Sequence, residues 1–204
     1  MNIPKKNIIV KIKGMFMKIL CIDFVNGEWY KTHEIFMEPL KNKKWVSDFI
    51  KTWELNIKSN LEEEQIKSLI NLRTVLSKMI YANCLKEEID INDLNILNKY
   101  TESFKFKRNI IIENNEYKII NKSIENTGNV FIYEIISSFF LLISENKFDR
   151  LNFCKNPDCR WVFYDESKNK TRKWCDNTCA SLMRVRKYRE RQNDISPQIL
   201  KVNK

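Results

Sequence analysis

Four cysteines near the C-terminus have the residue type and spacing of a zinc site. Cys154 and Cys159 are separated by the turn-forming residues KNPD, and Cys175 and Cys179 are separated by DNT. Zinc takes four ligands in a tetrahedron, with sulfur at about 2.3 Å, so two close pairs can converge on one ion. Four thiolates fill the coordination shell and leave no position for water. We therefore expect one structural zinc ion rather than a catalytic one.

The fifteen residues between the two cysteine pairs predict how the chain brings the pairs together. Residues 161–164, the polar turn DESKNK and the segment TRKW have the pattern of a β-hairpin. Cys175 and Cys179 are four residues apart, so we expect them on one face of the first turn of a following helix. The order of turn, hairpin and helix predicts a treble-clef-like finger.

The residues after Cys179, SLMRVRKYRERQ, predict a helix with a basic surface. Arginine suits phosphate and guanine recognition, and acidic residues are almost absent here, so nucleic acid is the expected partner. The predicted nucleic-acid contacts are the five basic residues of this helix and two that precede Cys175. They are Arg172, Lys173, Arg184, Arg186, Lys187, Arg189 and Arg191. Leu182 and Val185 are expected to pack this helix against the finger. The alternative is a solvated helix whose arginines face water.

The basic charge of the chain is concentrated in this region. The 204 residues include 36 Lys and Arg against 26 Asp and Glu, a net charge of +10. Residues 1–149 hold 22 basic and 20 acidic residues, a net of +2, whereas residues 150–191 hold 12 and 5, a net of +7. A charge confined to one short region indicates an anionic partner, and we expect DNA.

The remaining features predict a cytoplasmic protein with reduced cysteines. No secretory signal or membrane span is visible, because Lys11, Lys13 and Lys18 interrupt the first apolar stretch. In a reducing compartment, paired cysteines more often hold a metal than form disulfides. Cys21 and Cys84 lie alone in apolar surroundings and are expected in the core.

Upstream of the cysteines, the apolar pattern predicts a mainly α fold of the α+β type. A helical domain with a short N-terminal strand and a β-hairpin is expected over residues 1–148, the zinc finger over 149–192 and an unstructured tail over 193–204. The predicted elements are a buried strand at 17–25, a helix at 43–54, a second helix that follows an Asn60 cap and runs to about residue 86, helices at 92–102 and 129–146, and a hairpin at 105–122. Asn60 and Glu63 form the expected capping pair of the second helix.

The predicted core residues come from the apolar faces of these helices. Trp45, Phe49 and Trp53 share one face of the first helix, where core packing is favoured over a ligand pocket. The other predicted core positions are Ile66, Leu69, Ile70, Leu76, Ile80, Leu94, Ile96, Leu97, Phe131, Ile135, Phe139 and Leu142.

The string CKNPDCRWVFYDESKNKTRKWCDNTCASLMRVRKYRERQ resembles the CGNR zinc finger. Trp174-Cys175 and the basic run over 184–191 match its pattern, and Asp165, Ser167 and Asn169 match its hairpin. The namesake residues differ, since Ala180, Ser181 and Leu182 follow Cys179 where the family has Gly, Asn and Arg.

The N-terminal part resembles the ABATE domain that usually precedes this finger. LCIDFVNG at 20–27 is similar to its LxLDFVNT opening, with Gly27 in place of threonine, and LINLRTVLSKMI at 69–80 is similar to its leucine-arginine helix. Asp23, Asn26 and Arg73 match the polar positions of these motifs. They form either a small-molecule site or a strand cap and a buried ion pair, and the structural interpretation is favoured.

The two resemblances imply a stress-induced bacterial transcription regulator that binds DNA, with the first domain as effector or dimerisation domain. The alternatives are a zinc-stabilised protein-interaction or RNA-binding module, and a redox switch in which oxidised thiolates release zinc. An enzyme is not expected, because the chain has no Ser-His-Asp set or phosphate loop and only one histidine, His33. A homodimer would suit a regulator that reads a two-fold site.

Overall fold

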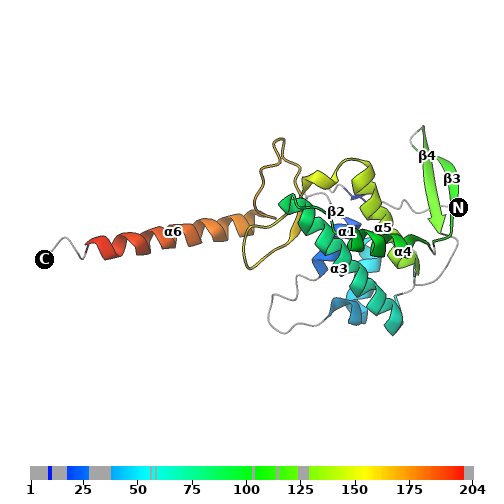
Figure 1. The fold of residues 1–204 in the computed structure, drawn as a ribbon, viewed down its shortest axis with the longest axis horizontal. Helices are drawn as coiled ribbons and strands as arrows, with labels where there is room; N and C mark the ends of the chain where they lie inside the picture. The colour runs from blue at the N-terminus through cyan, green and yellow to red at the C-terminus, as the bar shows by residue number, and fades with distance from the viewer. Residues whose placement is uncertain are drawn as a thin grey trace.

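The computed structural model describes residues 9–10, 18–27, 38–55, 57, 59–102, 104–113, 115–123 and 129–199. Over these ranges the chain forms six α-helices and three two-stranded antiparallel sheets, which confirms the mainly α fold class. The helices α1 to α5 form one body, and α6 extends from it as a single helix (Figure 1). His33 lies outside the described residues.

The elements follow one another along the chain with short 3₁₀ turns, η2 and η3, between them. They are β1 (Ile9–Val10), β2 (Lys18–Ile19), α1 (Leu20–Asn26), η2 (Pro39–Lys41), α2 (Lys43–Thr52), α3 (Glu63–Leu85), α4 (Ile91–Glu102), β3 (Phe106–Glu113), β4 (Glu116–Ser123), α5 (Asn129–Ser144), η3 (Phe148–Arg150), β5 (Leu151–Phe153), β6 (Val162–Tyr164) and α6 (Asn177–Ile199). The sheets pair β1 with β2, β3 with β4 and β5 with β6.

The predicted strand over residues 17–25 is wrong. Of its described residues, 18–25, only Lys18–Ile19 are a strand, and the chain then forms the helix α1. Every α1 side chain is buried except Asp23, which is half-buried, and the helix contacts α3, α5 and β6. A short apolar run that is buried on all sides fits a strand or a helix equally well, because neither period shows in it.

The longer helices agree with their predicted positions. α3 starts directly after a different cap, Glu62, whose backbone N–H donates to Oε1 of Gln65 at 2.9 Å, so the predicted Asn60–Glu63 cap is wrong. In α4, Leu97 is buried, but Leu94 is exposed because α4 packs on α3 by a narrow face. No helix among the described residues is long and apolar enough to cross a membrane.

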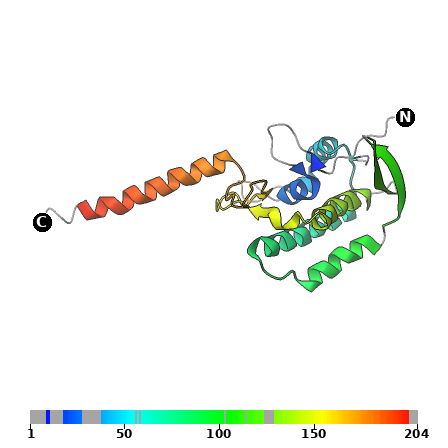
Figure 2. The ribbon, with the colours of Figure 1, turned by 90° about the horizontal axis from the view of Figure 1, so that it is seen from above.

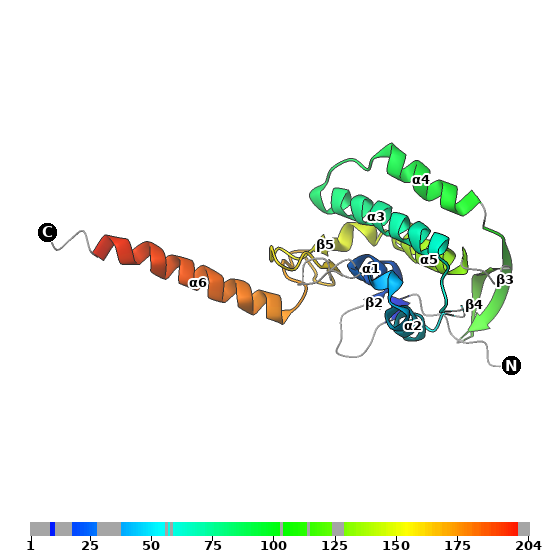
Figure 3. The same ribbon diagram turned by 90° about the horizontal axis from the view of Figure 1, so that it is seen from below.

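Aromatic rings from three helices meet in the centre of the core. Phe24 of α1, Phe49 of α2 and Phe131 of α5 lie with their ring centroids 5.8 to 6.4 Å apart. Trp45 stacks on Phe49 at 5.1 Å, and Trp53 is buried. The predicted core role of the α2 stripe is therefore confirmed. α3 and α5 lie side by side and complete the core around α1 (Figures 2 and 3).

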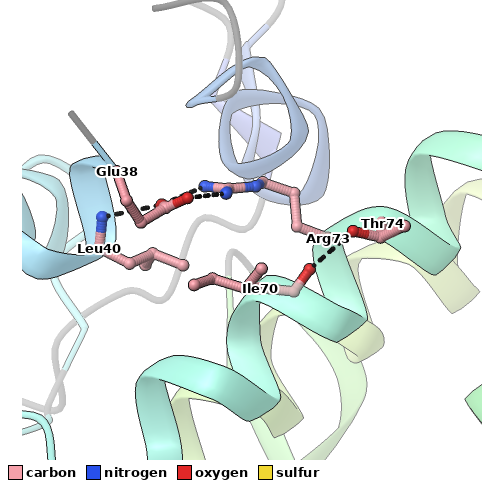
Figure 4. A network of polar contacts seen from close by, with 5 residues as sticks. All are labelled: Glu38, Leu40, Ile70, Arg73 and Thr74. Atoms are coloured by element: carbon pink, nitrogen blue, oxygen red, sulfur yellow. Dashed lines mark hydrogen bonds and ion pairs between the residues drawn. The ribbon is translucent and has the colours of Figure 1, made fainter. Parts of the chain in front are cut away.

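A buried ion pair closes the core beside α1. Arg73 of α3 is fully buried, and its guanidinium donates to both carboxylate oxygens of Glu38, at 2.9 and 2.5 Å (Figure 4). Oε1 of Glu38 also accepts from the backbone N–H of Leu40 at 3.1 Å. A Cβ on Gly27 would lie 3.3 Å from the Trp45 ring and 3.7 Å from Nη1 of Arg73, so a threonine here would press on Trp45.

Removing one member of this ion pair should destabilise the protein strongly. Glu38→Gln removes the carboxylate that accepts from both Nη atoms of the buried Arg73 guanidinium, so we expect a loss of about 3 kcal/mol in the free energy of unfolding. Lys67→Gln is the matched control, because Lys67 forms an exposed ion pair with Glu63 and Glu64 that contributes about 0–1 kcal/mol. Urea denaturation of the zinc-loaded chain measures both. Equal losses in the two variants would contradict the structural role of the buried pair.

Candidate metal centre

The first cysteine pair lies in the turn of the β5–β6 hairpin. Cys154 directly follows β5, and its backbone N–H donates to the Trp161 carbonyl at 2.8 Å, which extends the ladder by one pair. The chain reverses through residues 155–160, where Arg160 adopts a left-handed conformation with φ of 53°. Backbone hydrogen bonds therefore hold Cys154 and Cys159 at the end of the hairpin.

The strand pairing differs from the prediction. β6 pairs with β5, which precedes Cys154, and residues 171–174 are not a strand. A buried carboxylate organises this segment instead, since Asp165 accepts from the backbone N–H groups of Ser167 at 2.8 Å and Arg172 at 2.9 Å. Burial acts to raise the pKa of Asp165, but its bonds with Ser167 and Arg172 outweigh burial and lower it. Sequence shows the turn residues but not which strand β6 pairs with.

The second pair is placed by the start of α6. Cys175 lies two residues before the helix, and Cys179 lies in its first turn. Between them, Asp176 caps the helix, with Oδ1 accepting from the Cys179 N–H at 2.8 Å. The prediction that both cysteines share the first turn thus holds for Cys179 alone.

The four sulfurs converge on one point. All four Sγ atoms lie within 4.8 Å of one another, with Cys159 and Cys175 3.6 Å apart and Cys175 and Cys179 3.7 Å apart. A tetrahedral shell with zinc–sulfur bonds of about 2.3 Å requires sulfurs about 3.8 Å apart. The cysteines are free thiols. Their geometry fits one zinc ion, held structurally by four thiolates.

Asn156 supports this shell, and the sequence alone gave no reason to select it beyond its place in the KNPD turn. Its side chain is buried, and Nδ2 donates to the sulfur of Cys179 at 3.4 Å. Oδ1 accepts from the backbone N–H of Asp158 at 3.3 Å. The amide therefore fixes the turn of the first pair and stabilises a thiolate of the second, as ligand-supporting residues do in metal sites.

The thiols must lose protons to bind the ion. Burial raises the pKa of Cys159 to about 11 and also raises the pKa of Cys175. Burial acts in the same direction on Cys154, but hydrogen bonds with the backbone of Cys175 and Asn156 lower its pKa. Cys159 and Cys175 are therefore protonated at neutral pH before metal binds, and zinc displaces those protons.

The first cysteine pair is built on the helical body. Asn26 of α1 acts like a strand neighbour to Val162, with Nδ2 donating to its carbonyl at 2.9 Å and Oδ1 accepting from its N–H at 2.8 Å. On the other side, Nδ2 of Asn83 donates to the Phe148 carbonyl at 2.9 Å. Leu151, Val162 and Tyr164 belong to the main core cluster, whereas the cysteines form a separate small one.

The polar motif residues of the N-terminal domain are engaged in internal contacts. Asn26 bonds to β6, and Arg73 bonds to Glu38, so both have a structural explanation. Asp23 is half-buried on the same helix as Asn26. Of the isolated cysteines, Cys21 is a core residue as predicted, whereas Cys84 is half-buried at the edge of the core. Burial raises the pKa of Cys21 to about 12 and that of Cys84 to about 11.

The predicted nucleic-acid contacts fall into two groups. Arg172 is half-buried, and its guanidinium donates to the carbonyls of Trp174, at 2.7 Å, and Cys175, so it holds the finger together. The other six are exposed: Lys173, Arg184, Arg186, Lys187, Arg189 and Arg191. Of these, Arg186 forms an ion pair with Asp158 of the cysteine turn.

α6 differs from its prediction in two ways. Leu182 and Val185 do not pack on the finger, and about half of each side chain is exposed. Beyond Met183, every described side chain of the helix, as far as Gln192, is exposed. The helix also continues to Ile199, through part of the predicted unstructured tail, because a formed helix propagates at one hydrogen bond per residue. Residues 200–204 lie outside the described part of the chain.

Removing the Asn156 amide should weaken zinc binding. In Asn156→Ala the sulfur of Cys179 loses its donor and the turn of the first pair loses its brace, so we expect the zinc affinity to fall by about 10- to 100-fold. Competition with a chromogenic chelator measures the affinity, and Asn98→Ala, on the exposed face of α4, is the control. An Asn156→Ala affinity equal to that of the control would refute the supporting role.

Zinc affinity should also fall steeply as the pH is lowered. Each thiol proton that zinc displaces costs about tenfold in affinity for every pH unit below the thiol pKa. Since Cys159 and Cys175 are both protonated near neutrality, we expect a decrease well beyond about tenfold between pH 7.5 and 6.5. The same chelator competition at the two pH values measures it, and a pH-independent affinity would contradict these protonation states.

The family comparison agrees with this geometry. The model of the CGNR zinc finger matches residues 150–192, which hold the β5–β6 hairpin, the four cysteines and the first part of α6. No curated protein matches the chain. By its similarity to the CGNR zinc finger and by its four converging thiols, this region is a zinc-binding module.

Proposed function

We propose that the protein binds DNA through α6 and acts as a transcription regulator, in a binding rather than a catalytic role. In this proposal the helical body is an ABATE-like effector or dimerisation domain. The observation that supports it most is a basic helix that starts at the zinc site and stands clear of the rest of the molecule (Figure 1). The similarity of residues 150–192 to a zinc finger family adds to it.

The charge and length of α6 suit a duplex groove. Between Asn177 and Gln192 the helix holds five basic residues and one acidic residue, Glu190. Arg184, Lys187 and Arg191 are spaced by three and four residues and share one face. At about 1.5 Å per residue they span about 10 Å, and the major groove, about 12 Å wide, admits a helix.

The departure at residues 180–182 bears on this surface. Leu182 occupies the position where the family has arginine, and its side chain is half-exposed on α6. An arginine here would therefore add one cation to the exposed helix without disturbing a packed residue. The replacement leaves the zinc ligands unchanged and reduces the expected number of phosphate contacts by one.

One observation favours a second candidate function, a protein-interaction module. Leu182, Val185 and Tyr188 are all at least 48% exposed and form an apolar strip along α6. Exposed apolar strips on helices are typical of surfaces that bind other proteins. We prefer DNA to a protein as the partner of α6, because its basic residues outnumber the three apolar residues of the strip.

The test is fluorescence anisotropy of a labelled random-sequence duplex with zinc-loaded protein at several salt concentrations. Phosphate contacts release counterions, so log K should fall linearly with log salt, by about 0.9 for each contact. Arg184→Gln/Lys187→Gln/Arg191→Gln should lower this slope by about 3 units and weaken binding, and Leu182→Arg should raise it by about 1 unit.

A matched control separates specific contacts from overall charge. Lys43→Gln/Lys44→Gln/Lys51→Gln removes the same charge from the exposed surface of α2 and should leave the slope unchanged. An equal effect of the two triple variants would refute α6 as the interface. Preference for a matched RNA duplex would favour the RNA-binding alternative. No binding to either duplex at ~50 mM salt would favour the protein-interaction module, because electrostatic binding is strongest at low salt.

A further inference from the structure

The β3–β4 hairpin exposes an apolar face that the proposed DNA-binding role does not use. Ile110, Ile112, Tyr117 and Ile119, here called the hairpin patch, are between 68% and 81% exposed. They are the most exposed large apolar side chains among the described residues. Contiguous exposed apolar surface on this scale marks an interaction site more often than chance exposure does.

The strand register brings the four side chains together. Ile110 lies opposite Ile119, and Ile112 lies opposite Tyr117. Residues directly opposite in an antiparallel pair point to the same face, as do residues two apart on one strand, so these two cross-strand pairs are adjacent. Ile111, between Ile110 and Ile112, and Asn109, which precedes Ile110, are half-buried and belong to the opposite face.

A two-stranded hairpin with one bare apolar face is incomplete as a folding unit. Isolated hairpins are marginally stable in water, and a sheet gains stability when its apolar face packs against another layer. The eight residue pairs of β3 and β4 form a regular ladder, so the backbone holds the four side chains of the patch in a defined arrangement. Such a surface fits an apolar partner of similar shape.

We propose that the hairpin patch is a homodimer interface, in which the patch of one copy packs face to face on the patch of a second copy. A two-fold contact joins identical surfaces, so an apolar face is complementary to itself. Glu116 belongs to the opposite face, and the exposed Arg108, two residues from Ile110 on the patch face, lies at the edge of the patch, so the contact between the two copies is mainly apolar. Two apolar sheet faces can pack about 10 Å apart.

The distribution of charge favours a second copy as the occupant. Residues 1–149, which include the hairpin, have a net charge of only +2, and the strongly basic region lies elsewhere. The hairpin lies at the end of the helical body remote from α6 in all three views (Figures 1 to 3). Two copies can therefore meet at the patch without bringing their basic helices together, and both zinc fingers stay accessible.

The area of the patch sets the strength of the contact. Side chains of this size bury roughly 400 Å² per copy, or roughly 800 Å² in the dimer. Stable specific interfaces bury about 1,200–2,000 Å², and smaller ones are weak or transient. We therefore expect a weak, reversible dimer, and take a Kd on the order of 10 µM as the scale to be tested.

Sedimentation equilibrium of the zinc-loaded full chain tests the proposal without nucleic acid, so its outcome is independent of DNA binding. Between about 1 and 300 µM the chain should show a monomer–dimer equilibrium near the expected Kd. Ile110→Thr/Ile119→Thr should raise the Kd at least about tenfold, because threonine keeps the β-branched shape that strands prefer but removes apolar area. Ile91→Thr is the matched control, an exposed isoleucine on α4.

Hydrogen exchange of the unmodified chain gives a second readout that does not depend on the folding of a variant. Amides of residues 106–123 should exchange more slowly at high than at low protein concentration, while those of α6 should not change. A chain that stays monomeric at the highest concentration would overturn the proposal. So would equal effects of the hairpin and Ile91 variants, or concentration-dependent protection on α6 in place of the hairpin.

Discussion

The arrangement of the C-terminal region depends on four thiolates that share one zinc ion. Beyond Met183 the described side chains of α6 are exposed, so the helix is held at its first turn. Cys175, Cys179 and the Asp176 cap provide that attachment, together with the Arg186–Asp158 ion pair. An exposed ion pair contributes little. The zinc–thiolate bonds therefore fix the direction in which the basic helix leaves the molecule.

The ion joins two parts of the chain that are supported very differently. Cys154 and Cys159 belong to a hairpin whose strands lie in the main core, and Asn26 bonds to β6 as a neighbouring strand would. The second pair belongs to a loop and a helix that contribute nothing to that core cluster. Zinc therefore links a cysteine pair that the core holds in place to a second pair that is otherwise weakly held. This linkage couples metal binding to the position of α6 more than to the stability of the helical body.

The parts of this structure that the sequence predicted are those governed by local chemistry. Ligand spacing identified the four cysteines, and helical periodicity identified α2, α3, α4 and α5. The helix α1 was mistaken for a strand because burial on all sides removes any period. The pairing of β6 with β5 and the bonds of Asp165 and Asn156 depend on contacts between separated segments, which spacing does not reveal. Leu182 and Val185 were misplaced because an apolar residue on a helix does not specify which surface, if any, covers it.

The two proposed surfaces reinforce each other through their separation. The hairpin patch and α6 lie at opposite ends of the molecule, so one can pair with a second copy while the other contacts DNA (Figure 3). Once two copies are bound to one polymer, each presents its patch at an effective concentration that can approach the millimolar range. A contact with a Kd on the order of 10 µM is then largely formed, although it is mostly dissociated in dilute solution. Under the two proposals, a small apolar patch would be sufficient for dimers that form on DNA and separate when released.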